Sequence, residues 1–241
     1  MMKYLNLVLF AGMIVMNYLA NALPLNGKAT NELSDSLPNL FVPAGITFAI
    51  WGVIYLLLVT YCIVQFTGKN QIAISGISWL FGVSCLLNAL WIVTWHYEKL
   101  PLSLLVMLGL LVSLIWINLI INDLPLGIIK AAFGVYLGWI CIATIANTTA
   151  LLVHYNWNTF GISQEVWTII MIAIGAIIVS LTIFRINNPF VGLSVIWAFT
   201  GIIIKRQDDY RSIVIAAVTA IAVVCIVTIW GFVRKTKGAA V

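Results

Sequence analysis

Charged side chains are scarce in this chain of 241 residues, in which Asp, Glu, Lys and Arg together make up only 8%. Soluble domains carry about 25% of such residues. Hydrophobic residues make up 63% of the sequence, and a soluble monomer tolerates exposed apolar patches of only a few hundred Å². The scarcity of charge therefore excludes a water-soluble globular protein and indicates a protein whose solvent is the lipid bilayer.

Alternating segments of about ten residues, which mark the strands of a membrane β-barrel, are also missing. Long unbroken apolar runs replace them, and such runs cross a bilayer as helices of about 20 residues. Candidate spans cover residues 4–22, 44–66, 73–96, 101–122, 127–152, 165–185, 188–204 and 212–233. We therefore predict an all-α, polytopic transmembrane helical bundle of about eight spans, with both termini on the same side. The chain is therefore expected to be a multi-pass membrane protein.

Ionisable residues are nearly absent from the middle of these runs, which disfavours proton pumps and transporters built on buried acids. Lys130 lies near the start of the fifth run, where its ammonium group can snorkel to the interface. Two isolated His residues cannot form a multi-His zinc site, and the four Cys residues lack C-x-x-C spacing. We expect no metal, no catalytic residue and no required cofactor. A missing motif lowers the expectation of an enzyme without excluding one.

A basic patch on a soluble domain is missing as well, so the net charge of +5 predicts no nucleic-acid partner. The expected partners are the lipid bilayer and a hydrophobic small molecule. A homodimer is an open alternative to a monomer.

One connection is long, from Leu23 to Val42, whereas the other six are short. Loops of this length are often lids or binding loops, and the alternative is a solvated connector. The first run can also be read as a cleaved signal peptide, because Ala20-Asn21-Ala22 fits an A-x-A site. Asn6, Asn17 and Asn21 lie on roughly one helical face, however, which suits a helix that packs against others.

Tryptophan is plentiful, with ten residues, and some of it lies deep in the runs. Three runs carry polar and aromatic residues on one helical face, namely Trp51 and Tyr55; Asn88, Trp91 and Trp95; and Tyr136, Trp139, Ala143 and Asn147. Indole and amide groups in hydrocarbon need hydrogen-bond partners. We expect the three faces to meet around a pocket for a flat, mostly apolar ligand. The alternative is helix–helix packing without a ligand.

The same residues resemble the translocator protein / tryptophan-rich sensory protein family (TspO/MBR). Pro43, Trp51 and Tyr55 keep the family's spacing in one helix, and Leu87-Asn88 with Trp91 matches its Leu-Asn-x-x-Trp signature. A third signature is matched by four identities at fixed spacing, in Tyr136, Trp139, Ala143 and Asn147. The chain departs from the family at Val135, which replaces a proline, and at Thr47 and Ala49, where the family usually shows Phe and Pro.

The resemblance implies an enlarged, bacterial-type member with a five-helix core at 43–185. Residues 1–42 would add an N-terminal transmembrane helix and the long loop, and residues 186–241 would add two transmembrane helices and a basic tail. Family roles include transport, sensing and porphyrin breakdown, and the ligands are tetrapyrroles and in some members sterols. The sequence therefore predicts an integral membrane receptor or carrier for a porphyrin. The alternatives are a secondary transporter or permease for another small solute, and a non-ligand-binding membrane scaffold.

Overall fold

The computed structural model describes residues 1–23, 25–37 and 39–238. Pro24 and Pro38, which belong to the long loop, and residues 239–241 lie outside the described residues. The side chains of residues 31 and 235–238 are not described either. The side chains of Lys235 and Lys237, in the predicted basic tail, are therefore outside the description.

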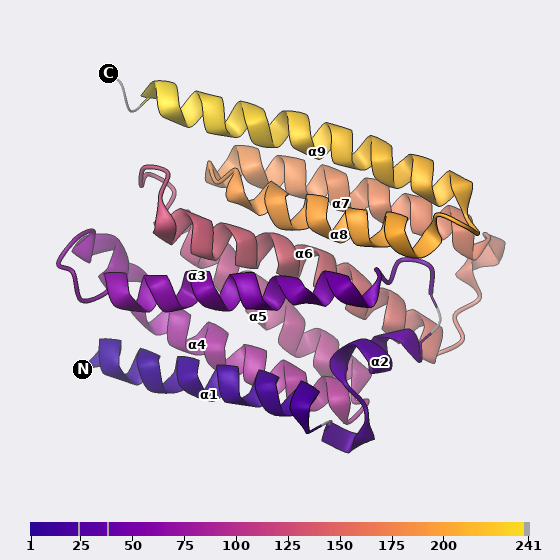
Figure 1. Cartoon of the computed structure of the whole chain (residues 1–241), viewed down its shortest axis with the longest axis horizontal. Helices are drawn as coiled ribbons and strands as arrows, with labels where there is room; N and C mark the ends of the chain where they lie inside the picture. The colour runs from indigo at the N-terminus through magenta and orange to yellow at the C-terminus, as the bar shows by residue number, and fades with distance from the viewer. Residues whose placement is uncertain (24, 38, 239–241) are drawn as a thin grey trace.

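Helices account for almost all of the described residues, and the prediction of an all-α bundle is confirmed (Figure 1). In chain order they are α1 (Met2–Ala22), η1 (Leu25–Gly27), α2 (Thr30–Asp35), η2 (Gly45–Ala49), α3 (Ile50–Val64), α4 (Gln71–His96), α5 (Leu100–Ile120), α6 (Ile128–His154), η3 (Thr159–Gly161), α7 (Gln164–Ile186), α8 (Phe190–Arg206) and α9 (Arg211–Gly238). Each predicted run forms a helix, with boundaries shifted by a few residues.

Seven of the described helices are long and apolar enough to cross a membrane. The seventh predicted span, 188–204, corresponds to α8, which has only 17 residues. At a rise of about 1.5 Å per residue it extends about 25 Å, less than the ~30 Å hydrocarbon core. α8 runs antiparallel to α7 and α9, and both chain ends lie at one end of the bundle, as predicted (Figure 1).

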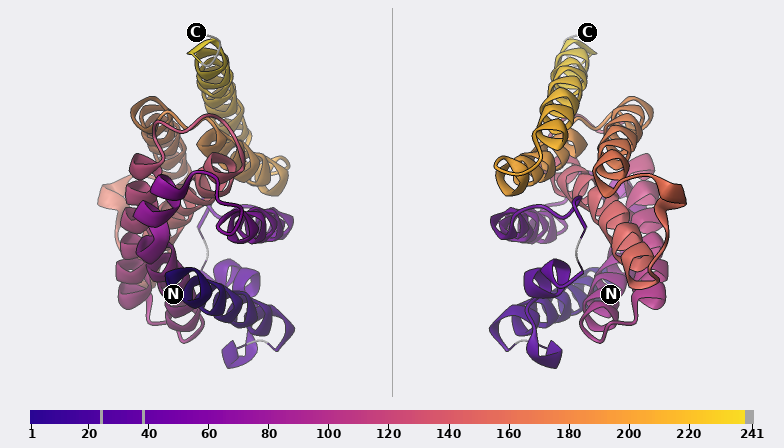
Figure 2. Two further views of the ribbon diagram at one scale, coloured as in Figure 1. Left: turned by 90° about the vertical axis from the view of Figure 1, so that its left-hand side faces the viewer. Right: turned by 90° about the vertical axis from the view of Figure 1, so that its right-hand side faces the viewer.

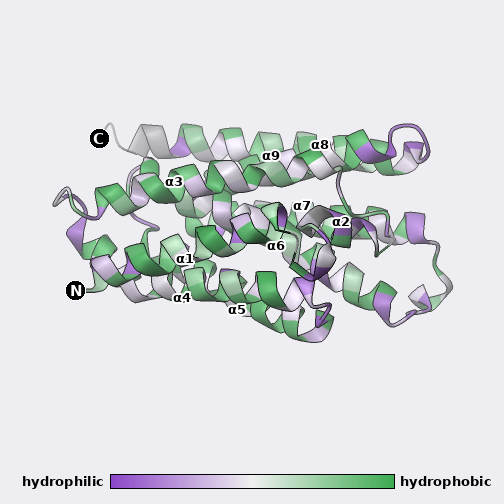
Figure 3. Ribbon diagram, turned by 60° about the horizontal axis from the view of Figure 1, so that its bottom comes forward, coloured by the Kyte–Doolittle hydropathy of each residue, from purple (hydrophilic) through white to green (hydrophobic). Residues whose placement is uncertain are grey.

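Hydrophobic residues prevail along the helices, whereas hydrophilic residues gather towards the two ends of the bundle (Figure 3). Leu56, Leu105 and Ile226 are each more than half exposed. Side chains of this kind are stable against lipid and would be costly against water. The chain is thus an integral, multi-pass membrane protein.

The helices pack in a connected series in which α1 contacts α4, α4 contacts α5, and α5 contacts α6. α6 then packs on α8, α8 on α9, and α9 on α7. α3 packs mainly on α6 and lies beside α1, on the side of the molecule opposite α5 (Figure 2). These contacts group α7 with α8 and α9, and they place α1 against α4. The division at residues 43 and 185 stays a prediction.

Small residues allow α6 and α8 to approach closely. A Cβ atom built on Gly138 would overlap the carbonyl oxygen of Val191 and the hydroxyl of Ser194. A Cβ atom on Gly134 would lie 2.7 Å from the side chain of Asn188. Glycine at these positions therefore sets the distance between the two helices, as small residues do in membrane bundles.

Lys130 differs from its sequence prediction, because it is buried, with 1% of its surface exposed. Its Nζ atom donates hydrogen bonds of 2.8 Å to the carbonyl oxygens of Asn122 and Asn187, which lie just past the ends of α5 and α7. The carbonyls at helix C-termini lack helical partners and carry partial negative charge. The snorkelling prediction is wrong, because these carbonyls hold the ammonium group inside the bundle.

Candidate functional site

The three polar-aromatic faces meet in the interior of the bundle, with Trp51 of α3 at their centre. Its ring lies 5.7 Å from Tyr55, 6.3 Å from Trp91, 5.9 Å from Tyr136 and 6.2 Å from Trp139, measured between ring centroids. Stacked and edge-to-face arrangements at such distances are those that aromatic pairs favour. The rings of α3, α4 and α6 therefore form one connected group.

The group extends at both sides. Trp95 stacks on Trp91 with a centroid distance of 6.1 Å, and Phe48 of η2 meets Trp139 edge-on at 6.0 Å. We call this set the aromatic cage, and its members are Phe48, Trp51, Tyr55, Trp91, Trp95, Tyr136 and Trp139.

Asn88 lies at the inner end of the aromatic cage, fully buried. Its Nδ2 donates to Oη of Tyr136 over 2.8 Å, and its Oδ1 accepts from Nδ2 of Asn17 over 2.8 Å. α1, α4 and α6 are thereby joined through side chains alone. Because both ends of the amide are used, Asn88 positions Tyr136 rather than facing the cage as a free hydrogen-bonding group.

Asn147 joins α4, α5 and α6 in the same way. Its Oδ1 accepts hydrogen bonds from Nε1 of Trp91 at 3.3 Å and from Oγ of Ser103 at 2.9 Å. Its Nδ2 donates to the carbonyl oxygen of Ala143, one turn earlier in α6. The amide therefore fixes the indole of Trp91 in its place in the cage wall.

The cage encloses a void of about 40 Å³, lined by residues that include Trp51, Trp91, Trp95 and Trp139. Three buried donors at the cage have no hydrogen-bond partner within the described structure, namely Nε1 of Trp95, Nε1 of Trp139 and Oη of Tyr55. Buried polar groups are bonded in the great majority of cases. The aromatic cage thus has unused hydrogen-bond donors and no charged side chain among its described lining residues.

The long connection covers one end of the cage. We call its described residues 25–37 and 39–44 the strap. Thr30, Ser34 and Pro43 of the strap line the void, and Oγ1 of Thr30 lies 3.3 Å from Nε2 of His96 at the end of α4. Nδ2 of Asn26 donates to the carbonyl oxygen of His96 over 3.0 Å. The strap therefore lies over the cage mouth, where the sequence left a lid and a connector as alternatives.

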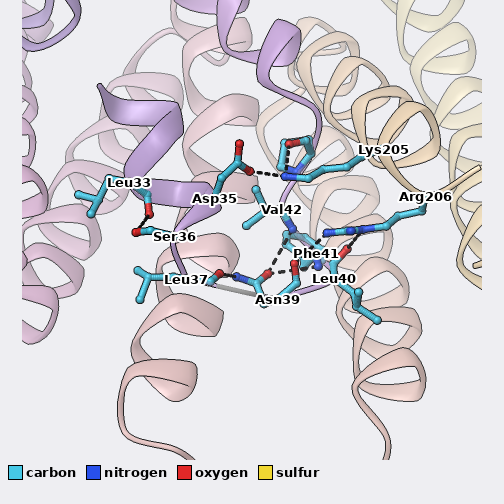
Figure 4. A network of polar contacts seen from close by, with 11 residues as sticks. Leu33, Asp35, Ser36, Leu37, Asn39, Leu40, Phe41, Val42, Lys205 and Arg206 are labelled. Carbon is cyan, nitrogen blue, oxygen red and sulfur yellow. Dashed lines mark hydrogen bonds and ion pairs between the residues drawn. The ribbon is translucent and has the colours of Figure 1, made fainter. Parts of the chain in front are cut away.

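The other half of the strap is held by the end of α8 (Figure 4). Lys205 forms an ion pair with Asp35. Arg206 donates from Nη2 to the carbonyl oxygen of Asn39 over 2.9 Å and from Nε to that of Leu40 over 3.1 Å. Charge-assisted hydrogen bonds of this kind are stronger than neutral ones. α8 therefore fixes the strap segment that leads into α3.

A larger hollow lies beside the cage, between α1 and α3. It has a volume of about 620 Å³, and Trp51 and Tyr55 form part of its wall together with Asn17 and Tyr18. Thr30, Phe48 and Trp51 border both this groove and the cage void. The side chain of Trp51 thus lies between the cage void and the groove.

All nine residues that the sequence proposed for a ligand site lie in or directly beside the cage, and their role in binding stays a prediction. Trp51, Trp91, Trp95, Trp139, Ala143 and Asn147 line the void, Tyr55 lines the groove, and Asn88 and Tyr136 support them from behind.

Sequence reasoning missed Phe48, Ser103, Ile142 and Ala146 as members of the site. The sequence did indicate a contact for Asn17, because the asparagine face of the first run predicted packing against other helices. Ser103 carried no signal, because a serine in a membrane helix commonly bonds to its own backbone.

A family model described as TSPO-like protein matches residues 3–230. Neither the search of curated proteins nor the search of solved structures finds a match. The family match covers almost the whole chain, including every residue of the aromatic cage and the strap, and the chain therefore belongs to the family of TSPO-like proteins.

Proposed function

We propose that the protein is a membrane receptor or carrier that binds a flat, largely apolar ligand, a tetrapyrrole such as a porphyrin, in the aromatic cage. Trp51, Trp91 and Trp139 supply the stacking walls, on three different helices. The activity is binding and release, without a covalent step.

One observation carries this proposal: buried donors without an acceptor belong to side chains that line an aromatic void. Nε1 of Trp95 and of Trp139 are in this state, and both indoles line the void. An unpaired buried donor costs about 1–3 kcal/mol, and a ligand with carbonyl or carboxylate oxygens at its edge removes that cost. A porphyrin combines such edge groups with a flat apolar ring.

The cage has to widen before such a ligand fits. Ligand pockets have volumes of roughly 300–1,000 Å³, whereas the void measures about 40 Å³. The groove between α1 and α3, at about 620 Å³, is in this range and shares Trp51 with the cage. We propose that the ligand arrives from the bilayer through this groove, and that movement of Trp51 and the strap joins groove and void.

Titration with protoporphyrin, followed through the fluorescence of the porphyrin itself, tests the proposal. Trp139→Ala should weaken binding about tenfold or more, because burying an aromatic ring is worth about 1.5–3 kcal/mol and 1.4 kcal/mol is tenfold in affinity. Trp116→Ala is the matched control, since Trp116 lies half exposed on the outside of α5. Equal affinities for wild type and Trp139→Ala would remove the cage from the binding site.

The role of the unpaired donors has its own test. Trp139→Phe keeps an aromatic wall and removes Nε1–H, so it should bind protoporphyrin more weakly than wild type. The same variant should bind an unsubstituted porphyrin ring, which has no edge oxygens, as wild type does. Equal losses for both ligands would show that the indole acts through its shape alone.

Receptor and carrier differ in whether the ligand crosses the bilayer. A soluble porphyrin-binding protein is enclosed as a trap in proteoliposomes and in liposomes that lack the membrane protein. If the membrane protein is a carrier, the proteoliposomes should accumulate porphyrin faster. If both kinds of vesicle accumulate porphyrin at the same rate although the cage binds it, the protein is a receptor and not a carrier.

A further inference from the structure

A second cavity lies on the far side of the strap, away from the aromatic cage. Its volume is about 430 Å³, and it shares no lining residue with the cage void. The strap contributes Asn39 and the two residues after it, α6 contributes its last turns, and α7 contributes its first turns with Gln164 and Met171. We call it the α6–α7 pocket.

The lining of the α6–α7 pocket combines polar and apolar side chains and is uncharged. Among the described residues that form it there is no Asp, Glu, Lys, Arg or His. Thr149 donates from Oγ1 to Oδ1 of Asn39, so part of the polar lining is already paired. The side-chain amides of Asn156 and Gln164 are exposed and make no hydrogen bond to the described protein. Two free amides, each a donor and an acceptor, are therefore available to a ligand.

Polarity changes along the pocket. Asn156 and Gln164 lie beyond the end of α6 and at the start of α7, at the hydrophilic end of the bundle. The ring centroids of Trp157 and Trp167 lie 5.0 Å apart at the same level, as in the aromatic belts at membrane interfaces. Met171, two turns into α7, extends the lining towards the apolar part of the bundle. The pocket thus has a polar mouth and an apolar interior.

We propose that the α6–α7 pocket binds an uncharged amphipathic lipid, whose hydroxyl or ester head meets Asn156 and Gln164 and whose chain lies against Met171. An uncharged head is favoured over a charged one, because the described lining provides hydrogen-bonding amides and no ionic partner. The bilayer supplies such lipids at the depth of the pocket. This lipid site is separate from the aromatic cage and does not depend on which ligand the cage binds.

The lipid also touches the strap from behind. Asn39, Leu40 and Phe41 line the pocket, while Arg206 holds the carbonyl oxygens of Asn39 and Leu40 from α8. An occupied pocket therefore supports the segment that Arg206 fixes, and it stabilises the closed strap. Binding at the α6–α7 pocket and opening of the aromatic cage should oppose each other.

The test compares two amphiphiles with the same chain, mono-oleoylglycerol and oleate at a pH where its carboxylate is ionised. The full chain is delipidated in a maltoside detergent, and the bound amphiphile is counted by native mass spectrometry. We expect saturable binding of one mono-oleoylglycerol and at least about tenfold weaker binding of oleate. Equal binding of the two would overturn the uncharged class.

Variants locate the site. Met171→Trp fills the interior and should abolish specific binding, whereas Ile174→Trp places the same ring on the lipid-facing side of α7, where Ile174 is 38% exposed, and should bind as wild type does. Asn156→Ala with Gln164→Ala removes two exposed amides and should weaken binding several-fold; because the backbone at Asn156 is left-handed (φ 49) and alanine disfavours that conformation, thermal unfolding in detergent checks that the variant is folded. Unchanged binding in both the filled and the double-alanine variants would show that the lipid binds elsewhere.

Discussion

Asn17 of α1 donates a 2.8 Å hydrogen bond to Asn88 of α4, and Asn88 in turn donates to Tyr136 of α6. The chain of three side chains crosses the bundle behind the aromatic cage. It makes α1 part of the cage's support, although α1 contributes no residue to the wall of the void.

Replacing Asn17 tests this connection. Asn17→Leu leaves Oδ1 of Asn88 without its donor, and interhelical hydrogen bonds in membranes are worth about 0.6–2 kcal/mol. We expect the free energy of unfolding in detergent to fall by an amount in this range, and the melting temperature to fall with it. Asn21→Leu is the control, because Asn21 bonds only to the backbone of its own helix. A wild-type melting temperature for Asn17→Leu would mean that the asparagine chain adds nothing to stability.

The contacts from α8 should slow the opening of the strap. Lys205→Met with Arg206→Leu removes the ion pair to Asp35 and three hydrogen bonds to the strap backbone. Loss of about 1–2 kcal/mol from such partly exposed contacts should speed protoporphyrin association about tenfold, measured by stopped-flow fluorescence. Arg185→Leu is the control and should leave the association rate unchanged, because Arg185 lies in the last turn of α7, away from the strap. Equal rates in all three proteins would show that the strap is not the barrier.

The close contact of α6 with α8 predicts a steric effect at Gly138. Gly138→Ala places a Cβ atom on the backbone of Val191, and overpacking of this kind costs about 1–3 kcal/mol. Gly52→Ala is a matched control, because a Cβ atom there meets nothing within 4 Å, and alanine favours a helix. Thermal unfolding in detergent should separate the two variants. If both variants unfolded at the same temperature, the close approach of α6 and α8 at Gly138 would not contribute to stability.

Burial of Lys130 predicts a large effect for a residue that the sequence placed at the interface. Lys130→Met leaves the carbonyl oxygens of Asn122 and Asn187 without its ammonium donor. Hydrogen bonds to charged groups contribute about 1.5–3 kcal/mol each, so the variant should unfold at a clearly lower temperature or denaturant concentration. Lys99→Met, at an exposed lysine, should be close to neutral. A stable Lys130→Met protein would contradict the capping role.

The sequence alone was sufficient to predict the membrane location, the helices and the residues that share a helical face. Scarcity of charge and the length of the apolar runs set the class, because hydrophobic transfer into lipid depends on composition and length. The spacing of Asn88, Trp91 and Trp95, like that of Tyr136, Trp139 and Asn147, follows from the helical period alone. The family resemblance had the same basis, since its signatures are those faces.

Tertiary structure decided which groups are already used and which remain free. Asn88 and Asn147, expected from the sequence to bond a ligand, are held by Asn17, Tyr136, Trp91 and Ser103. The indoles of Trp95 and Trp139 keep their donors unpaired. Hydrogen bonding depends on atoms brought within about 3 Å of each other, from helices far apart in the chain. A helical period fixes the direction of a side chain on its own helix, and only the packing of other helices determines what that side chain meets.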